Sequence, residues 1–166
     1  MKNSIFIKIF SGYLLIVIVI LAITFPLSFR AIRHHHIDTL TGNLKNLCIT
    51  LKLKISPLLE SNQIEDLDTL IKKLGKQIDT RITVISPEGV VFADSEKIPT
   101  VMENHKNRIE IIQAIKYGFG TSLRYSASVK EEMLYVAIPI EKDDEVCGVL
   151  RASLFLKEIN TLLNNL

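Results

Sequence analysis

Cysteine is scarce in this sequence, and the two cysteines present are far apart. Cys48 and Cys147 do not form a Cys-x-x-Cys pair, so the sequence does not predict a structural zinc site. Outside the cytoplasm they could form one disulfide, and two buried free thiols are the alternative. Lysine and arginine are not clustered, and the net charge is only +2, so the sequence does not indicate a nucleic-acid-binding protein. Internal repeats and low-complexity tracts are also absent.

Charge is missing altogether between Ile9 and Phe29. As a helix this stretch would be about 30 Å long, which is the thickness of the hydrocarbon core of a bilayer. A cleavable signal peptide would have a shorter apolar region and a small-x-small cleavage site, and this sequence has neither feature. We therefore expect an uncleaved transmembrane helix over residues 9–29.

The charges on either side of this expected anchor do not give its orientation. Two lysines precede it and two arginines follow it, at positions Lys2, Lys8, Arg30 and Arg33. The positive-inside rule compares such charges, and here they balance. About 130 residues follow the anchor, which is enough for one domain with its own core.

Two amphipathic helices are predicted after the anchor. Between Ile37 and Leu58 apolar residues recur every three or four positions, and this long helix continues directly from the anchor. Pro57 is expected to interrupt it and to open a new turn after Ser56. A second stripe of the same kind predicts a helix over residues 64–78. We expect part of the first stripe to pack on the rest of the domain and part to meet a second chain. That stripe consists of Leu40, Leu44, Leu47, Leu51 and Ile55.

The pattern then changes to one typical of strands. RITVIS (residues 81–86), the turn PEG and VVFAD predict a β-hairpin. NRIEIIQAIKYG predicts a helix that Gly118 stops. Three more strands, a final helix from Phe155 and polar connecting segments complete the domain. The three strands are expected at residues 121–128, 133–140 and 146–154. Sequential hairpins predict an α+β fold with a five-stranded antiparallel sheet and flanking helices.

A polar stretch between the expected hairpin and the next helix has the residue types of a hydrolytic site. It contains Asp94, Ser95, Glu103, His105 and Arg108. A membrane-anchored hydrolase would use Ser95 as nucleophile and His105 as base. Ser95 is not part of a G-x-S-x-G elbow, so a polar loop without catalytic chemistry is the favoured interpretation.

Three consecutive histidines, His34, His35 and His36, follow the expected anchor. In a helix they point about 100° apart, so they cannot all face one metal ion. We expect no metal site here and an interfacial polar segment instead. A response to pH is the alternative, because histidine titrates near neutrality.

An anion-binding pocket is the third candidate site. Alternation places Arg124 and Ser126 on one face of their strand, and Tyr135 lies opposite the apolar face of the next strand. We expect any small-molecule site to lie between these residues and the segment of His105 and Arg108, because arginine matches carboxylate and phosphate groups. An internal ion pair is the alternative, with Asp94 or Glu103 as the acid; a solvated outer face is another.

The span from Arg81 to Pro139 resembles the extracytoplasmic sensor region of bacterial membrane histidine kinases, particularly those similar to the phosphate-regulon sensor kinase. The matching pieces are RITVISPEGVVFADS, MENHKNRIE with AIKYGFG, and LRYSASVKEEMLYVAIPI. The motif positions are Asp94, Ser95, Met102, Glu103, Asn104, His105, Arg108 and Glu110. Capping of turns and helix starts is the expected work of Asp94, Ser95, Glu103 and Asn104.

This resemblance implies a PAS-like fold of the PDC or Cache type. It also implies a cytoplasmic segment 1–8, a sensor domain over residues 30–160 outside the cytoplasm, and a single-pass location in the inner membrane. Residues 161–166 would begin a helix leading toward a second membrane span. Such sensors work as homodimers and sense a small ligand or a partner protein.

The chain has no segment like a kinase core, so we expect it to be neither an enzyme nor a binder of cofactors. The input domain of a chemoreceptor or diguanylate cyclase is the alternative within signalling.

Overall fold

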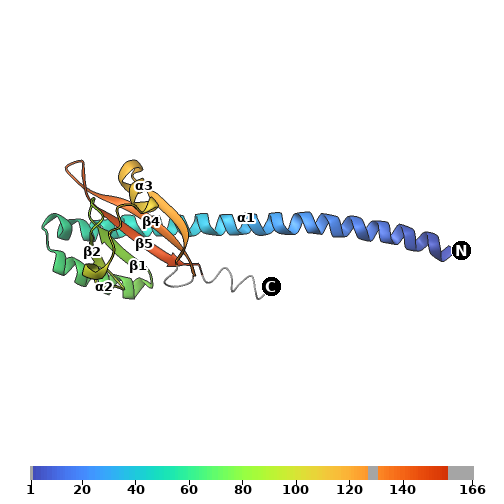
Figure 1. Cartoon of the computed structure of the whole chain (residues 1–166), viewed down its shortest axis with the longest axis horizontal. Coiled ribbons are helices and arrows are strands. Elements are labelled where there is room, and N and C mark those ends of the chain that lie inside the picture. The colour runs from blue at the N-terminus through green and yellow to red at the C-terminus, as the bar shows by residue number, and fades with distance from the viewer. Residues whose placement is uncertain (1, 127–130, 157–166) are drawn as a thin grey trace. The chain divides into compact units, whose positions relative to one another are not determined.

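The computed structural model describes residues 2–126 and 131–156 (Figure 1). Two compact units make up the chain, residues 1–39 and residues 40–166. Helix α1 (Lys2–Glu60) belongs to both. The sequence predicts a final helix from Phe155, but Phe155 is the last residue of a strand. The rest of the predicted helix, beyond Leu156, lies outside the described residues.

The first unit consists of the N-terminal part of α1, and its apolar side chains are exposed. Leu15 is 62% exposed and Phe25 is 75% exposed. This part of the helix is long and apolar enough to cross a membrane, and none of its most apolar stretch is buried within the protein. Such a surface is what a helix surrounded by lipid requires.

The predicted interruption of α1 at Pro57 is wrong, since the helix continues to Glu60. A proline in a helix removes the hydrogen bond to the carbonyl four residues earlier, here that of Leu53. Leu53 is 77% exposed, so water can solvate that carbonyl. Ile55 and Leu59 are buried on either side of the proline, and this packing holds the last turn in helical form.

The second unit contains the other predicted helices and strands. After α1 come α2 (Ile64–Ile78), β1 (Arg81–Ile85) and β2 (Val91–Asp94). A short 3-10 turn, η1 (Pro99–Val101), precedes α3 (Ile109–Tyr117). Strands β3 (Gly120–Ser126), β4 (Glu131–Lys142) and β5 (Glu145–Phe155) follow. The expected hairpin, the helix ended by Gly118 and the three further strands are thus confirmed.

The five strands form one antiparallel sheet in the order β2-β1-β5-β4-β3. Hairpins join β1 to β2, β3 to β4 and β4 to β5, as expected. Pairing of β1 with β5 brings the first hairpin beside the last one, and places Thr83 opposite Arg151. The predicted α+β fold with its five-stranded antiparallel sheet is confirmed.

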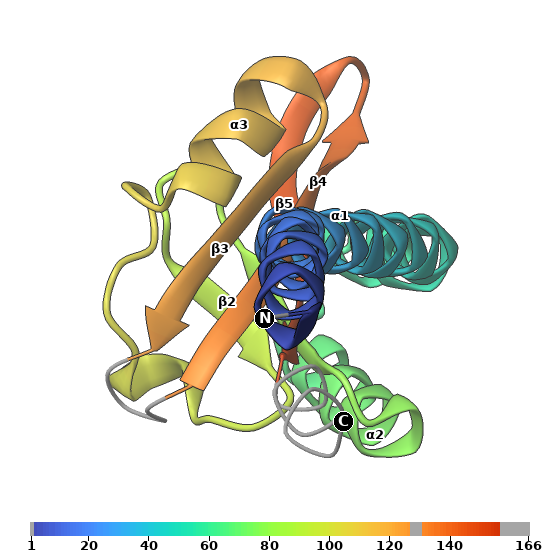
Figure 2. The same ribbon diagram turned by 90° about the vertical axis from the view of Figure 1, so that its right-hand side faces the viewer.

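Helices cover both faces of this sheet (Figure 2). On one side lie α2 and the second-unit part of α1. The Cys48 thiol of α1 forms a hydrogen bond with the backbone of Ala152 in β5. On the other side α3 packs over a buried apolar cluster. That cluster consists of Ile85, Val91, Ile111, Ala114, Ala137 and Val149.

The apolar stripe of α1 is largely consumed by this packing. Leu44, Leu51 and Ile55 are each at most 5% exposed. The exposed apolar residues of the same part of α1 are Ile49 and Leu53, which lie off the predicted stripe. The contact of this stripe with a second chain stays a prediction, since Leu40 and Leu47 are only partly buried.

Candidate functional site

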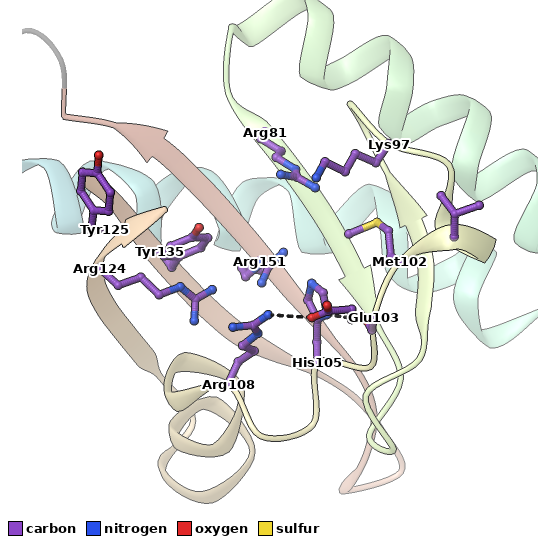
Figure 3. Close-up of a pocket in the computed structure, with 11 residues that line it drawn as sticks. Arg81, Lys97, Met102, Glu103, His105, Arg108, Arg124, Tyr125, Tyr135 and Arg151 are labelled. Carbon is purple, nitrogen blue, oxygen red and sulfur yellow. Dashed lines mark hydrogen bonds and ion pairs between the residues drawn. The ribbon is translucent and has the colours of Figure 1, made fainter. Parts of the chain in front are cut away.

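A pocket of about 650 Å³ opens on the α3 side of the sheet (Figure 3). Strands β1, β3, β4 and β5 contribute to its lining, and the segment between β2 and α3 supplies the rest. The lining residues are Arg81, Lys97, Val101, Met102, Glu103, His105, Arg108, Arg124, Tyr125, Tyr135 and Arg151. Cationic side chains therefore dominate the pocket wall.

Two of the arginines share one buried carboxylate oxygen. Arg124 on β3 donates from Nη2 to Glu110 Oε1 at 3.2 Å, and Arg151 on β5 donates from Nη1 to the same oxygen at 3.3 Å. Glu110 is fully buried, and its other oxygen has no hydrogen-bond partner among the described residues. Arg151 also donates to the Thr83 hydroxyl at 3.2 Å, while its Nε lacks a partner within the described structure. Burial lowers the pKa of the Arg151 guanidinium, and Glu110 opposes that effect.

Glu110 reaches this position because α3 lies unusually close to β3. A Cβ atom at Gly120 would collide with the backbone carbonyl of Glu110, so only glycine permits this approach. The sequence places glycine at the start of β3, where the first turn of α3 must approach the sheet. Gly120 therefore positions the carboxylate between Arg124 and Arg151.

The ring of Tyr135 lies close to both guanidinium groups. The distance from its centroid to Cζ is 4.1 Å for Arg124 and 5.3 Å for Arg151. A cation over an aromatic face is attracted by the ring quadrupole. The Tyr135 hydroxyl is bonded to the thioether sulfur of Met133, a weak acceptor, at 3.3 Å. Tyr135 thus holds the arginines in place.

A second buried ion pair lies at the β1 end of the pocket. Arg81 contacts both carboxylate oxygens of Asp94, with its Nη2 3.1 Å from Oδ2. Asp94 also accepts from the Thr83 hydroxyl and from the backbone N–H groups of Glu96 and Lys97. Burial alone would raise the pKa of Asp94, but these partners hold it below its usual range.

His105 lines the pocket as a neutral ring. Burial, together with the charge of Arg151, lowers its pKa to about 4. Its Nδ1 lies 2.7 Å from the Glu103 carbonyl oxygen, which can only accept, so Nδ1 carries the proton and Nε2 is left as an acceptor. The pocket therefore offers an uncharged acceptor beside its cations.

The loop that carries His105 is fixed to the β1–β2 turn. The His105 N–H donates to the Gly89 carbonyl, and the Asn104 amide donates to the Glu88 carbonyl. Gly89 has φ +90°, and an added Cβ would collide with Lys106 N. The next cation is Arg108, whose guanidinium pairs with the exposed Glu103 at 3.5 Å.

Cations outnumber acids at this site. Five line the pocket, against one lining carboxylate, that of Glu103. Asp94 and Glu110 contact the arginines from behind the lining, and Glu96 lies 3.7 Å from Arg81. Positive charge therefore remains in excess even when all four carboxylates are included, which is the electrostatic setting of an anion site.

Most of the predicted ligand-site residues come together here. His105, Arg108, Arg124 and Tyr135 all line the pocket. Ser126 ends β3, and its side chain is outside the part that the structure describes. Among the motif residues Glu103 lines the pocket, while Asp94, Ser95 and Asn104 do not.

Ser95 and His105, the pair required by a hydrolase, make separate contacts. The Ser95 hydroxyl accepts the Ile82 N–H at 3.0 Å, and Ser95 packs against Gly75 of α2. No hydrogen bond joins Ser95 to His105 in residues 2–126 and 131–156.

Sequence reasoning missed Arg81, Arg151 and Lys97, and it did not assign the internal acid to Glu110. Arg151 had a usable signal, because it is the only charged residue inside the apolar segment VCGVLRASLF. An arginine in the middle of a buried strand requires a partner.

The structure does not form a disulfide between the two cysteines and does not turn the histidine segment into a binding site among the described residues. Cys48 and Cys147 are both free thiols. Within the described ranges no three histidine, cysteine or acidic residues are grouped to hold a metal ion. His34 is exposed and pairs with Asp38 at 3.2 Å.

Comparison with known families identifies the class of this domain. The profile of the Single Cache-like family matches residues 55–154, which is more than half of the sequence. The chain therefore belongs to the Single Cache-like family, and the resemblance seen in the sequence is confirmed. No curated protein matches this sequence.

Solved structures with the same fold include sensor domains of two kinds. The sensor domain of the V. cholerae histidine kinase DctB is 14% identical, with a TM-score of 0.54 over 78% of this chain and 57% of that one. The E. coli DcuS sensor domain is 16% identical, with a TM-score of 0.58 over 77% of this chain and 97% of that one. The ligand-binding domain of the Campylobacter jejuni chemoreceptor Tlp3, in complex with 4-methylisoleucine, is 18% identical, with a TM-score of 0.58 over 75% of this chain and 54% of that one.

The chain thus spans little more than half of the DctB and Tlp3 domains. It carries a Cache domain with the fold of the sensor domains of histidine kinases and chemoreceptors, next to an apolar helix able to cross a membrane.

Proposed function

We propose that this chain is the extracytoplasmic input part of a membrane-bound sensor histidine kinase, and that its pocket binds a small anionic ligand. The observation that carries the proposal is the excess of cations in the pocket, with the nearly buried Arg151 among them. A buried guanidinium is costly unless its donors are satisfied, and the donors of Arg151 are only partly satisfied by the described residues.

An anionic ligand would complete these interactions. Arginine presents a planar fork of donors that fits two oxygens of a carboxylate or phosphate. The Arg108 guanidinium pairs only with the exposed Glu103 in the described structure, so its fork remains available to a ligand. The ligand of the Tlp3 domain, 4-methylisoleucine, is an amino acid and carries a carboxylate group, which supports a ligand with such a group.

Membrane topology follows from the same proposal. Lys2 and Lys8 lie in the cytoplasm, residues 9–29 cross the inner membrane, and the domain beyond Arg30 lies outside. The exposed apolar helix and the fold of the sensor domains support this arrangement. Two chains associate as a homodimer through α1.

The input domain of a chemoreceptor is the second candidate, because the Tlp3 domain has the same fold. Both candidates use a ligand pocket outside the cytoplasm. They differ in the output domain to which the sensor is joined, so the ligand test below applies to either.

The ligand is tested by thermal melts of the full chain in detergent micelles. Small carboxylates and inorganic phosphate are added at constant ionic strength, with chloride as the reference anion. A ligand that binds only the folded protein raises the Tm with its concentration. Arg108→Gln should abolish this shift and leave the Tm without anion nearly unchanged, because an exposed ion pair contributes little stability. The proposal fails if none of the anions raises the wild-type Tm.

Topology is tested with a reporter that is active only outside the cytoplasm, fused after Leu166. We expect activity from this fusion and none from a matched cytoplasmic reporter. The reverse result would exclude the extracytoplasmic location.

A further inference from the structure

We propose that Glu110 is a built-in competitor of the ligand: its carboxylate occupies the guanidinium groups of Arg124 and Arg151, and a bound anion displaces it. The inference rests on the proposed function, because it concerns the regulation of the same pocket.

The first argument is the position of the two arginines. Arg124 and Arg151 both line the pocket, whereas Glu110 does not. Each guanidinium therefore has one side toward Glu110 and another toward the space that a ligand would enter. Figure 3 shows Arg124 and Arg151 directed into the same cavity from β3 and β5.

The second argument is that Glu110 is poorly satisfied where it lies. Both arginines donate to Oε1, at 3.2 and 3.3 Å, and Oε2 is buried without a partner in the described residues. A buried carboxylate oxygen without donors is energetically unfavourable. An anion placed between the two guanidinium groups from the pocket could accept two hydrogen bonds from each fork.

Asp94, the other buried acid beside the pocket, is far better satisfied by hydrogen-bond donors than Glu110 is. Its two oxygens accept from Arg81, from the Thr83 hydroxyl and from the backbone N–H groups of Glu96 and Lys97. A carboxylate with that many donors is not easily exchanged for a ligand. Within the described residues the Glu110 carboxylate accepts from side chains alone, so its pairing depends on two arginines that a ligand can also engage.

Displacement of Glu110 would act on α3. Glu110 lies in the first turn of this helix, and its contact with the arginines ties that turn to β3 and β5. Phe119, just beyond the other end of α3, lies under the Lys45 ammonium of α1, 4.7 Å from the ring centroid. Release of the carboxylate therefore loosens the attachment of α3 to β3 and β5, and the chain that follows α3 reaches α1 through Phe119.

The affinity test compares two variants of the full chain in detergent micelles. Glu110→Gln keeps the side-chain shape but removes the competing charge. Glu141→Gln is the matched control, since it removes the same charge from an exposed acid that pairs with Lys52 and does not line the pocket. Acetate and inorganic phosphate are titrated at constant ionic strength, and binding is followed by the Tm.

We expect Glu110→Gln to bind the anions at least about tenfold more tightly, because the ligand no longer replaces a charged hydrogen-bond partner. Glu141→Gln should change the affinity by less than about threefold, because its exposed pair with Lys52 lies outside the pocket. Unchanged or weaker binding by Glu110→Gln would show that Glu110 is only a structural partner and would overturn the inference. An equal gain in both variants would overturn it too, because the effect would then be one of net charge.

Rescue by a small carboxylate provides an independent measurement. Glu110→Ala leaves a cavity beside Arg124 and Arg151, and formate should fill it and restore the Tm, whereas chloride should not. A variant that folds only with formate meets the expectation, because the anion then stands in place of the carboxylate. A variant that remains unfolded with formate overturns the inference.

The two proposals can fail separately. If the wild type binds no anion while formate rescues Glu110→Ala, Glu110 blocks the pocket and the proposed ligand function is wrong. If the wild type binds anions and neither variant behaves as expected, only the role of Glu110 is wrong.

Discussion

Arg151 and Arg124 hold the same carboxylate but differ in exposure. The side chain of Arg151 is 3% exposed, and that of Arg124 is 28% exposed. Removing one partner of a buried pair leaves an uncompensated charge, and this is far more destabilising than the loss of a partly solvated one. Removal of Arg151 is therefore expected to destabilise the fold more than removal of Arg124.

Arg151→Ala should destabilise the domain by about 3–5 kcal/mol, because Glu110 would lose its most buried partner. Arg124→Ala should cost only about 1–2 kcal/mol, since Arg151 still neutralises Glu110. Chemical denaturation of the full chain in micelles measures both. Equal losses would mean that exposure does not determine the energetics of this pair.

His105 makes the stability depend on pH. Its pKa is about 4 in the folded protein and about 6.5 in an unfolded chain, so the unfolded state binds more protons between these values. The contribution of neutral His105 to the free energy of unfolding should therefore be fully present above about pH 6.5. It should be lost as the pH is lowered toward 4, by up to about 3 kcal/mol. Asp94 has a lowered pKa, so the stability that it contributes is lost only at still lower pH.

Unfolding measured between pH 7.5 and pH 4.5 checks this, with His105→Gln as the control. The variant should be less dependent on pH over that range. An identical slope in both proteins would contradict a neutral, buried His105.

At the scale of elements, the sequence predicted the helices and strands because their apolar periods are regular. Hairpin neighbours could also be predicted, because short polar turns such as Asp143–Asp144 join adjacent strands; both aspartates have positive φ. Pairing of β1 with β5 could not, because it joins segments more than sixty residues apart. The arginine-rich site followed the same rule. His105 and Arg108 were found through a local motif, whereas Arg81 and Arg151 meet only through the long-range pairing.

Gly120 should be the most sensitive glycine for the position of α3. Gly120→Ala would force α3 away from β3 at Glu110, with a cost of about 1–3 kcal/mol. Gly42→Ala is the matched control: nothing lies within 4 Å of its added Cβ, and alanine favours a helix by about 1 kcal/mol. Thermal melts should show a lower Tm for the first variant and an equal or higher Tm for the second. A neutral Gly120→Ala would refute the close approach of α3 to β3.

At the scale of the whole molecule, the face of α1 left open by the fold determines how two chains can meet. Ile49 and Leu53 lie one turn apart on this helix and are 48% and 77% exposed. Leu44 and Leu51 are turned into the domain and are not available. A homodimer through α1 should therefore use the face of Ile49 and Leu53.

Cysteines at positions 49 and 53 should crosslink between chains in oxidised membranes, in a background carrying Cys48→Ala and Cys147→Ser. The native Cys48, which is buried in the domain, is the control: a protein carrying only Cys147→Ser should crosslink poorly. Crosslinking that is no stronger at 49 and 53 than at 48 would exclude this dimer face.

The reactivity of the Cys48 thiol can be used to measure how often α1 separates from the sheet. It is fully buried against β5, and burial raises its pKa to about 12, so an alkylating reagent meets neither an accessible sulfur nor a thiolate. Alkylation can proceed only during the moments when α1 lifts from the sheet. The rate of Cys48 alkylation, relative to that of the partly exposed Cys147, therefore measures how often this opening occurs in the native protein. If a ligand changes the alkylation rate at Cys48 but not at Cys147, then ligand binding in the pocket changes the packing of α1 against the sheet.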